Sequence, residues 1–467
     1  MSAYKSLLKV RAFETGVAQP FRKKRHRHVS ERPLVIAYVQ MAGEPFSLWG
    51  AYIGRRRESP AWIGCADPRN RDLQSALFES LARIMNENVR QCLATDDEPL
   101  QVWVSNPTAA ANFRRLGRVM RVRQVSDAVS RAGAILDVYA QSSNTPGSAL
   151  CVAATEILSA HRVTGQSDFE DANLAAQLVW WGRAILAEID PTFSPDRARA
   201  LSIFDAAARA ERFPMGTLTN PRADEDVLTN LVDDFTAANR AERPFHDEAA
   251  AIATALQRQV RPIWEAIWAA HREMRRIKES PSSDDRWADD TRQFRNQLEW
   301  LDTGGFRRYT DSPMQAARLL SSWESNQAGM ERSVVIEDDL ALVEAVLDAK
   351  AVVGTVTRVE QVKHGRKTHP FITLATPSTE LTEGTPLWLR CNTKISGHIV
   401  DVAQQDGATS LLIEVTKGMQ KEKLPVVGES HGFIAIEPPF PVRPKIPKDA
   451  PWTHASRRAE EAANVDE

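Results

Sequence analysis

Three acidic residues in the first third of the chain, Glu79, Asp127 and Asp137, have side chains that could carry out chemistry. Three or four carboxylates around a pair of divalent metal ions can align and stabilise both oxygens of a phosphoryl displacement, which is nuclease chemistry. Glu79 falls in the first long stretch of helical spacing, and Asp127 or Asp137 could supply a later ligand. These three residues are therefore the candidate catalytic residues of the sequence.

Glu79 lies in an α/β region at residues 33–124, and Asp127 and Asp137 follow it. Its apolar runs and helical spacings predict, in order, strands Leu34–Met41, Phe46–Ile53 and Ala61–Cys65, helix Leu73–Cys92, strand Leu100–Val104 and helix Ala109–Leu116. This order of elements is that of a ribonuclease H-like domain.

The acids that such a domain needs for metal binding are missing from two of the expected positions. The first strand contains no Asp or Glu, and the fourth strand ends in the neutral residues Ser105 and Asn106. We therefore interpret the domain as a scaffold without a metal site. A divergent metal-dependent nuclease that uses Glu79 with Asp127 or Asp137, helped by Glu44, is the alternative.

Other catalytic motifs are absent from the sequence. It contains no GxxxxGK[ST], GxGxxG, GxSxG or HExxH pattern, so we expect no ATPase of its own and no cofactor. Its four cysteines are far apart and form no CxxC pair, which argues against a zinc site and a disulfide framework. No apolar run reaches 18 residues and no secretion signal is recognisable, so we expect a cytoplasmic protein without a membrane segment.

Basic residues gather in three places although the formal net charge of the 467 residues is only −2. A leader at residues 1–32 carries the densest run, and two expected loops of the last third carry the others. Such patches can bind phosphates, and an aromatic residue in a nearby strand can stack on a base. The candidate nucleic-acid-binding residues are Arg22, Lys23, Lys24, Arg25 and Arg27 in the leader, Lys363, Arg366, Lys367, Lys417 and Lys421 in the loops, and Trp388 in a strand.

The rest of the chain predicts an α+β multidomain protein. Residues 125–350 show helical spacing almost throughout, and residues 438–467 form a proline-rich tail. The helices predicted in the first of these segments include Ala149–Ser159, Glu170–Ile189, Pro195–Glu211 and the long Asp247–Lys278. Residues 351–437 change to short β-branched runs separated by turn signals, which is typical of a small β-barrel. The expected barrel strands are Val352–Val359, Phe371–Ala375, Leu387–Arg390, Ile399–Val402, Ser410–Val415 and Val427–Ile436.

The barrel and the helix before it resemble a known arrangement. The segment 323–332, the following run 354–359, the triplet 387–389 and the strand 397–400 are similar in order to the barrel of superfamily 1 helicases of the Upf/Dna2 type. The α/β region resembles the ribonuclease H-like domain that precedes such helicases in some bacterial proteins. All helicase motifs are missing here, so the resemblance implies the accessory, non-motor half of such a machine, completed by a separate ATPase subunit.

The sequence thus favours a non-catalytic DNA- or RNA-binding accessory subunit of a helicase or nuclease complex, for example one that acts on foreign nucleic acid in bacterial defence. The alternatives are the divergent nuclease described above and a structural scaffold that binds other proteins through its helices. Salt-dependent binding of single strands, metal-dependent cleavage and the identity of the neighbouring gene would separate these three hypotheses.

Overall fold

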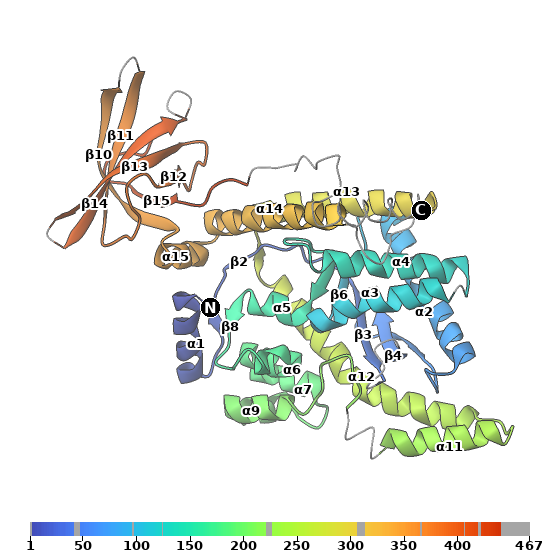
Figure 1. The fold of residues 1–467 in the computed structure, drawn as a ribbon. Helices are drawn as coiled ribbons and strands as arrows, with labels where there is room; N and C mark the ends of the chain where they lie inside the picture. Colours follow the sequence, from blue (N-terminus) through green and yellow to red (C-terminus); the bar gives the residue numbers. More distant parts are fainter. Residues whose placement is uncertain are drawn as a thin grey trace, which may run out of the picture.

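The fold combines a helix-covered sheet with a separate closed β-barrel near the C-terminus (Figure 1). In the computed structural model the described residues are 2–41, 47–95, 98–123, 125–220, 227–305, 313–364, 367–405, 407–418 and 422–439. Among the helices of these ranges, none combines the length and the apolarity needed to cross a bilayer. The predicted mixture of α and β structure and the predicted barrel are confirmed.

A five-stranded sheet forms the centre of the N-terminal part. Its strands are β3 (Leu34–Gln40), β4 (Leu48–Gly54), β5 (Ala61–Gly64), β6 (Val102–Val104) and β7 (Cys151–Ala153). The order across the sheet is β5-β4-β3-β6-β7, with β4 antiparallel to both β3 and β5, and with β6 and β7 parallel to β3. All seven residues of β3 are buried because this strand lies in the middle of the sheet and both of its faces are covered.

Helices cover both faces of the sheet, and alternate residues of β3 contribute to two different cores. Val35, Ala37 and Val39 belong to the core beneath the long helix α12 (His246–Arg275). The intervening residues belong to the core on the opposite face. The helices of that second core are α2 (Arg71–Thr95), α3 (Pro107–Val122), α4 (Asp127–Ser142) and α13 (Pro281–Asp302).

The segment predicted as all-helical also contains strands, which corrects the prediction. Residues Cys151–Ala153 form β7, and the helix predicted at Ala149–Ser159 is reduced to α5 (Ala154–Ser159), because three buried residues complete the parallel edge of the sheet. The predicted helix Glu170–Ile189 is broken at Gly182, whose backbone is extended. The remaining elements here are β8 (Arg162–Val163), η1 (Glu170–Ala172), α6 (Leu174–Trp181), η2 (Arg183–Ile185), α7 (Leu186–Ile189), α8 (Pro195–Ala200), α9 (Ile203–Ala210), α11 (Thr229–Arg240) and β9 (Lys278–Glu279).

The N-terminal residues are integrated into the body of the protein. Helix α1 (Ala3–Thr15) is followed by two short strands, β1 (Gln19–Pro20) and β2 (Lys24–Arg25). Strand β1 pairs with β8, and β2 pairs with β9 in the connection between α12 and α13. We refer to residues 16–30, which include both strands, as the N-terminal strap.

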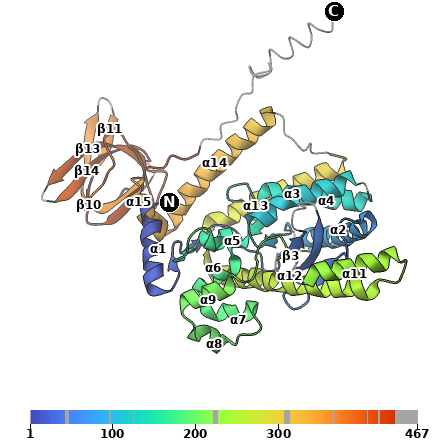
Figure 2. The same cartoon turned by 60° about the horizontal axis from the view of Figure 1, so that its bottom comes forward.

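The barrel follows two helices, α14 (Pro313–Glu337) and α15 (Asp339–Leu347). It has its own apolar core, which includes Val356, Ile372 and Leu411, and closes in the order β10-β11-β14-β13-β12-β15. Figure 2 shows α1 beside α15, at the junction between the barrel and the rest of the chain. The strands are β10 (Ala351–His364), β11 (Lys367–Thr376), β12 (Pro386–Leu389), β13 (Ser396–Gln405), β14 (Ala408–Lys417) and β15 (Ser430–Ile434).

Candidate nucleic-acid interface

Two of the predicted phosphate-binding lysines lie at the same end of the barrel. Lys363 pairs with Thr368 near the turn of the β10–β11 hairpin. Strand β14 runs antiparallel to β11, and Glu414 pairs with Phe371, so Lys417 lies three residues further toward the same hairpin turn. Both lysine residues are exposed. The structure therefore brings Lys363 and Lys417 to one end of the barrel, which we call the hairpin end.

The hairpin end projects away from the helical body (Figure 1). Strand β10 begins beside α15, where Ala351 packs in a small apolar cluster with Ala341 and Ala345. It is 14 residues long, which corresponds to roughly 45 Å of extended chain. Arg366 and Lys421 lie outside the described residues, and only the backbone of Lys367, at the start of β11, is described.

Acidic side chains lie at the other end of the barrel. Thr376, the last residue of β11, pairs with Thr409 at the start of β14, so the loop from β11 to β12 leaves from the end opposite to the hairpin turn. That loop carries Glu380 and Glu383, both exposed. On the barrel's outer face nearer the hairpin end, the buried Glu414 contacts the Nδ1 atom of His369 at 2.5 Å.

Trp388, the predicted base-stacking residue, packs against helix α14. The guanidinium carbon of Arg332 lies 4.9 Å from the centroid of a Trp388 ring. The same indole also packs against the apolar cluster that includes Val335 and Ile434. One face of this aromatic ring is thus already in contact with the protein, an arrangement that favours a role in holding the barrel on α14.

The arginines of the basic run in the N-terminal strap lie beside carboxylates of the body and of α15. Arg25 is 6% exposed and its guanidinium contacts Glu279 at 2.5 Å. Arg27 forms an ion pair with Glu156 at 2.8 Å, and Arg22 forms one with Glu344. A buried guanidinium requires such a partner because removing its charge from water is costly. The guanidinium groups of Arg22, Arg25 and Arg27 thus have internal carboxylate partners.

The two lysines of the run differ from the arginines. Lys23 is exposed and Lys24 is half-buried, and the backbone N–H groups of both donate to Asp338 at the start of α15, at 2.6 and 2.7 Å. The sequence predicted these cations as one phosphate-binding group. The structure instead distributes them along a strap that connects several carboxylates of the body and of α15.

Amide side chains occupy the edge of the sheet where a metal-dependent nuclease would need acids. Gln40 ends β3 and is 1% exposed, and its side-chain oxygen accepts a hydrogen bond from Asn112 at 3.2 Å. Asn112 also donates to the hydroxyl of Thr217 at 3.2 Å. Asn106, which follows β6, caps helix α3 and donates to the carbonyl of Met215 at 3.2 Å.

This set of donors does not fit a pair of divalent metal ions, which are held by several carboxylate oxygens. Amides that are already hydrogen-bonded to each other and to the 215–219 segment fill the positions instead. The neutral residues Ser105 and Asn106 were visible in the sequence. The contributions of Asn112 and Thr217 were missed, because only the tertiary fold brings them to this edge.

The three candidate catalytic acids lie on helices α2 and α4. Glu79 is exposed on α2, and Asp127 is exposed at the first residue of α4. Asp137 is buried on α4, with its carboxylate 3.8 Å from the guanidinium of Arg114. Within the described ranges, no group of three or more His, Cys, Asp or Glu side chains is arranged to hold a metal ion. Glu44, the additional acid of the nuclease alternative, lies outside these ranges.

Comparison of the chain with protein-family models, with curated proteins and with solved structures gave no match.

Proposed function

We propose that this chain is a non-catalytic, nucleic-acid-binding accessory subunit of a cytoplasmic complex that processes DNA or RNA, and that a separate helicase or nuclease subunit supplies the catalysis. The observation that carries the proposal is the separation of charge on the barrel. Lys363 and Lys417 lie at the hairpin end, whereas Glu380 and Glu383 lie at the opposite end. A phosphate backbone would be attracted to the first end and repelled by the second.

The sheet supports the non-catalytic part of the proposal. Its strand order, with three antiparallel strands followed by two parallel ones, fits the ribonuclease H-like arrangement that we infer for this domain. The ends of β3 and β6 carry Gln40 and Asn106 in place of carboxylates. Such a domain can position a strand or a partner protein without cutting nucleic acid.

Binding of labelled single-stranded DNA and RNA to the full chain across a salt series tests the proposal. On single strands, loss of a phosphate contact reduces the slope of log K against log salt by roughly 0.7. We therefore expect the double variant Lys363→Ala, Lys417→Ala to bind more weakly, with a slope smaller by roughly 1.4. Its preference among sequences should remain unchanged, because phosphate contacts carry no sequence information.

The matched control is the double variant Glu380→Gln, Glu383→Gln, which changes two exposed charges at the other end of the same barrel. It should bind as tightly as the unmodified chain or slightly more tightly. Binding that is absent, or that is insensitive to salt, would refute the proposal. An equal loss in both double variants would show that the hairpin end is not the interface.

A further inference from the structure

Helix α1, at the edge of the body (Figure 1), has apolar residues on two opposite faces. The face toward the body carries the buried residues Tyr4, Leu8 and Ala12. The outer face carries Leu7, Val10 and Phe13, which are 57–64% exposed. A surface helix normally has one apolar face and one polar face. The second apolar face of α1 stays open to solvent in the part of the chain that the structure describes.

Exposed phenylalanines gather at this outer face. Within the described ranges three phenylalanines are exposed, namely Phe13, Phe169 and Phe204. The rings of Phe13 and Phe204 lie 5.1 Å apart between their centroids. Phe169 follows Asp168, whose carboxylate pairs with Lys9 of α1 at 3.2 Å. All three rings thus lie on or beside α1, and aromatic residues are enriched in protein–protein interfaces.

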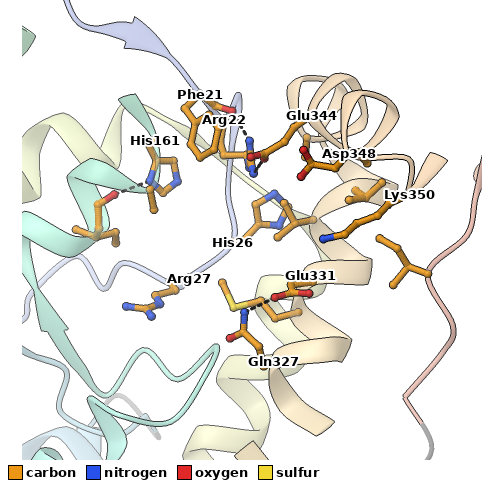
Figure 3. Close-up of a pocket in the computed structure, with 18 of the residues that line it drawn as sticks. Phe21, Arg22, His26, Arg27, His161, Gln327, Glu331, Glu344, Asp348 and Lys350 are labelled. Atoms are coloured by element: carbon orange, nitrogen blue, oxygen red, sulfur yellow. Dashed lines mark hydrogen bonds and ion pairs between the residues drawn. The ribbon is translucent and has the colours of Figure 1, made fainter. Parts of the chain in front are cut away.

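Helix α1 is held on the rest of the protein at both of its ends. Ser2, which caps its N-terminus, donates to Glu344 of α15, and the same carboxylate pairs with Arg22 of the strap. Arg22 lines a cavity between α5 and α14 (Figure 3). At the other end, Gly16 packs against Ile203 of α9. The outer face is therefore formed in advance, and a preformed surface loses less conformational entropy on binding.

The charges around the outer face are of both signs. Arg11 and Glu14 are exposed and lie three residues apart, so they are neighbours on the helix surface. Phe169 lies between Asp168 and Glu170 in the sequence. Carboxylates beside an exposed ring disfavour an anionic lipid surface, and mixed signs do not select a partner of a single charge. A second copy of the same surface offers both signs in return.

The area of this surface is sufficient for a dimer. Six apolar side chains, which we call the α1 patch, are 48–89% exposed: Leu7, Val10, Phe13, Val17, Phe169 and Phe204. Because one large apolar side chain presents on the order of 200 Å², the patch presents roughly 600 to 700 Å². Monomers rarely expose an apolar patch of this size. Two copies that cover it would bury roughly 1,200 to 1,400 Å², which reaches the range of specific interfaces.

We propose that the α1 patch is the contact between two copies of this chain, which pair about a two-fold axis close to Val10. Such an axis makes the two α1 helices antiparallel and uses the same surface of each copy. Leu7 of one copy then lies opposite Phe13 of the second copy. Val10, midway between these residues, meets Val10 of the second copy.

Sedimentation equilibrium of the full chain without nucleic acid tests this assignment. We expect a dimer with a Kd on the order of 1 to 10 µM, because the interface is at the lower end of the specific range. Val10→Glu places two carboxylates beside the axis and should raise this Kd at least about a hundredfold. Leu320→Glu, at an exposed position of α14, is the matched control and should dimerise like the unmodified chain.

A charge swap tests the two-fold axis itself. Val10→Lys alone should be as monomeric as Val10→Glu, because like charges again meet at the axis. An equimolar mixture of the Val10→Glu and Val10→Lys chains should recover the dimer, since opposite charges then lie side by side. This recovery also shows that both variant chains are folded.

Three results would overturn the proposal. The first is an unmodified chain that stays monomeric up to about ten times the expected Kd. The second is a dimer that persists in Val10→Glu, or a mixture that does not recover, because the contact would then lie elsewhere. The third is a monomer that binds phosphatidylcholine vesicles and loses this binding in Val10→Glu, which would make the patch a lipid-binding surface. These measurements contain no nucleic acid, so the proposed function is tested separately.

Discussion

Burial keeps three histidines of this fold uncharged at neutral pH. His26, His161 and His271 are each at most 5% exposed, and burial lowers the pKa of each to about 4. The Nε2 atom of His271 lies 2.8 Å from the carbonyl oxygen of Ser30, so it carries the proton of a neutral ring. The protein therefore folds around imidazoles that stay uncharged well below the ordinary histidine pKa of 6.5.

This arrangement predicts a loss of stability in mild acid. Between pH 6.5 and about 4 the unfolded chain binds protons at these histidines and the folded chain does not, so acidification favours unfolding. Each histidine should lower the free energy of unfolding by up to about 1.4 kcal/mol per pH unit. Asp290 acts in the opposite direction, because burial raises its pKa to about 6 and protonation then favours the folded state. The net change should thus equal that of roughly two histidines.

Urea unfolding at a series of pH values from 6.5 down to 4.5 measures this slope. Toward the lower limit Glu279 also adds to the loss of stability, because its ordinary pKa is 4.5 and its folded pKa is lowered to about 2. Burial alone would raise the pKa of Glu279, but the hydrogen bonds with His28 and Ser283 lower it by more. Removing one titrating ring with His161→Asn should reduce the slope. A free energy of unfolding that stays constant or rises over this range would contradict the expectation.

At the scale of elements, sequence patterns predicted the helices and strands whose formation depends on neighbouring residues in the chain. The apolar run of β3 and the three-to-four spacing in α12 correctly located this strand and the long helix. The three residues of β7 were read as helix because the periodicity of α5 follows them directly, and only pairing with β6 makes them a strand. The apolar spacing of the sequence continues across Gly182 and Ser202, but the helices end there. The predicted helices Glu170–Ile189 and Pro195–Glu211 were therefore too long.

In the candidate site, too, the sequence predicted the local features but not the contacts between distant residues. The sequence indicated the barrel lysines and the neutral residues at the end of β6, since both are local features. It could not indicate the ion pairs of Arg22 with Glu344 or of Arg25 with Glu279, whose partners lie hundreds of residues away in the chain. A run of charges has the same appearance in a sequence whether water or distant carboxylates surround it.

The contact between α3 and α4 depends on two glycines and provides a prediction at this scale. A Cβ atom at Gly117 would lie 2.2 Å from the backbone oxygen of Gly133, and one at Gly133 would lie 2.6 Å from that of Gly117. Neither backbone can move aside without separating the helices. Gly117→Ala should therefore lower the free energy of unfolding by about 1 to 3 kcal/mol, as overpacked cores do.

The direction of this change is informative because helix propensity alone predicts the reverse. Alanine stabilises a helix interior by about 1 kcal/mol relative to glycine. Gly216→Ala, in a bend where no atom lies within 4 Å of the added carbon, is a control for a glycine-to-alanine change without overpacking and should be nearly neutral. Denaturant unfolding of both variants distinguishes the two effects, and an increase in stability for Gly117→Ala would show that the helices do not pack this closely.

At the scale of the whole molecule, the barrel and the body have separate apolar cores and meet through polar contacts. The barrel core contains no residue of the sheet or of its helices. At the junction, Glu344 of α15 accepts from Ser2 and pairs with Arg22, and Glu337 of α14 accepts from Ser282. The orientation of the hairpin end relative to the body therefore depends on a few charged hydrogen bonds around the strap and the cavity.

Asp338 is the residue through which the strap and α15 are joined, and it is 1% exposed. Its Oδ1 atom accepts from the backbone N–H groups of Leu340 and Ala341 and caps α15, whereas Oδ2 accepts from those of Lys23 and Lys24. One carboxylate thus satisfies backbone donors of two separate segments. Asparagine has a single side-chain oxygen and is a good helix cap, so it can serve only one of the two segments.

The variant Asp338→Asn should consequently release the strap while α15 remains capped. Hydrogen bonds to a charged group contribute about 1.5 to 3 kcal/mol, so amide hydrogen exchange of Lys23 and Lys24 should become faster by about tenfold or more. Exchange in the barrel core around Ile372 and Leu411 should not change, because that core is independent of the strap. Asp339→Asn, which alters an exposed neighbour that pairs with Arg390, is the matched control. If the strap amides exchange equally fast in the unmodified chain and in Asp338→Asn, the Asp338 carboxylate does not hold the strap on α15.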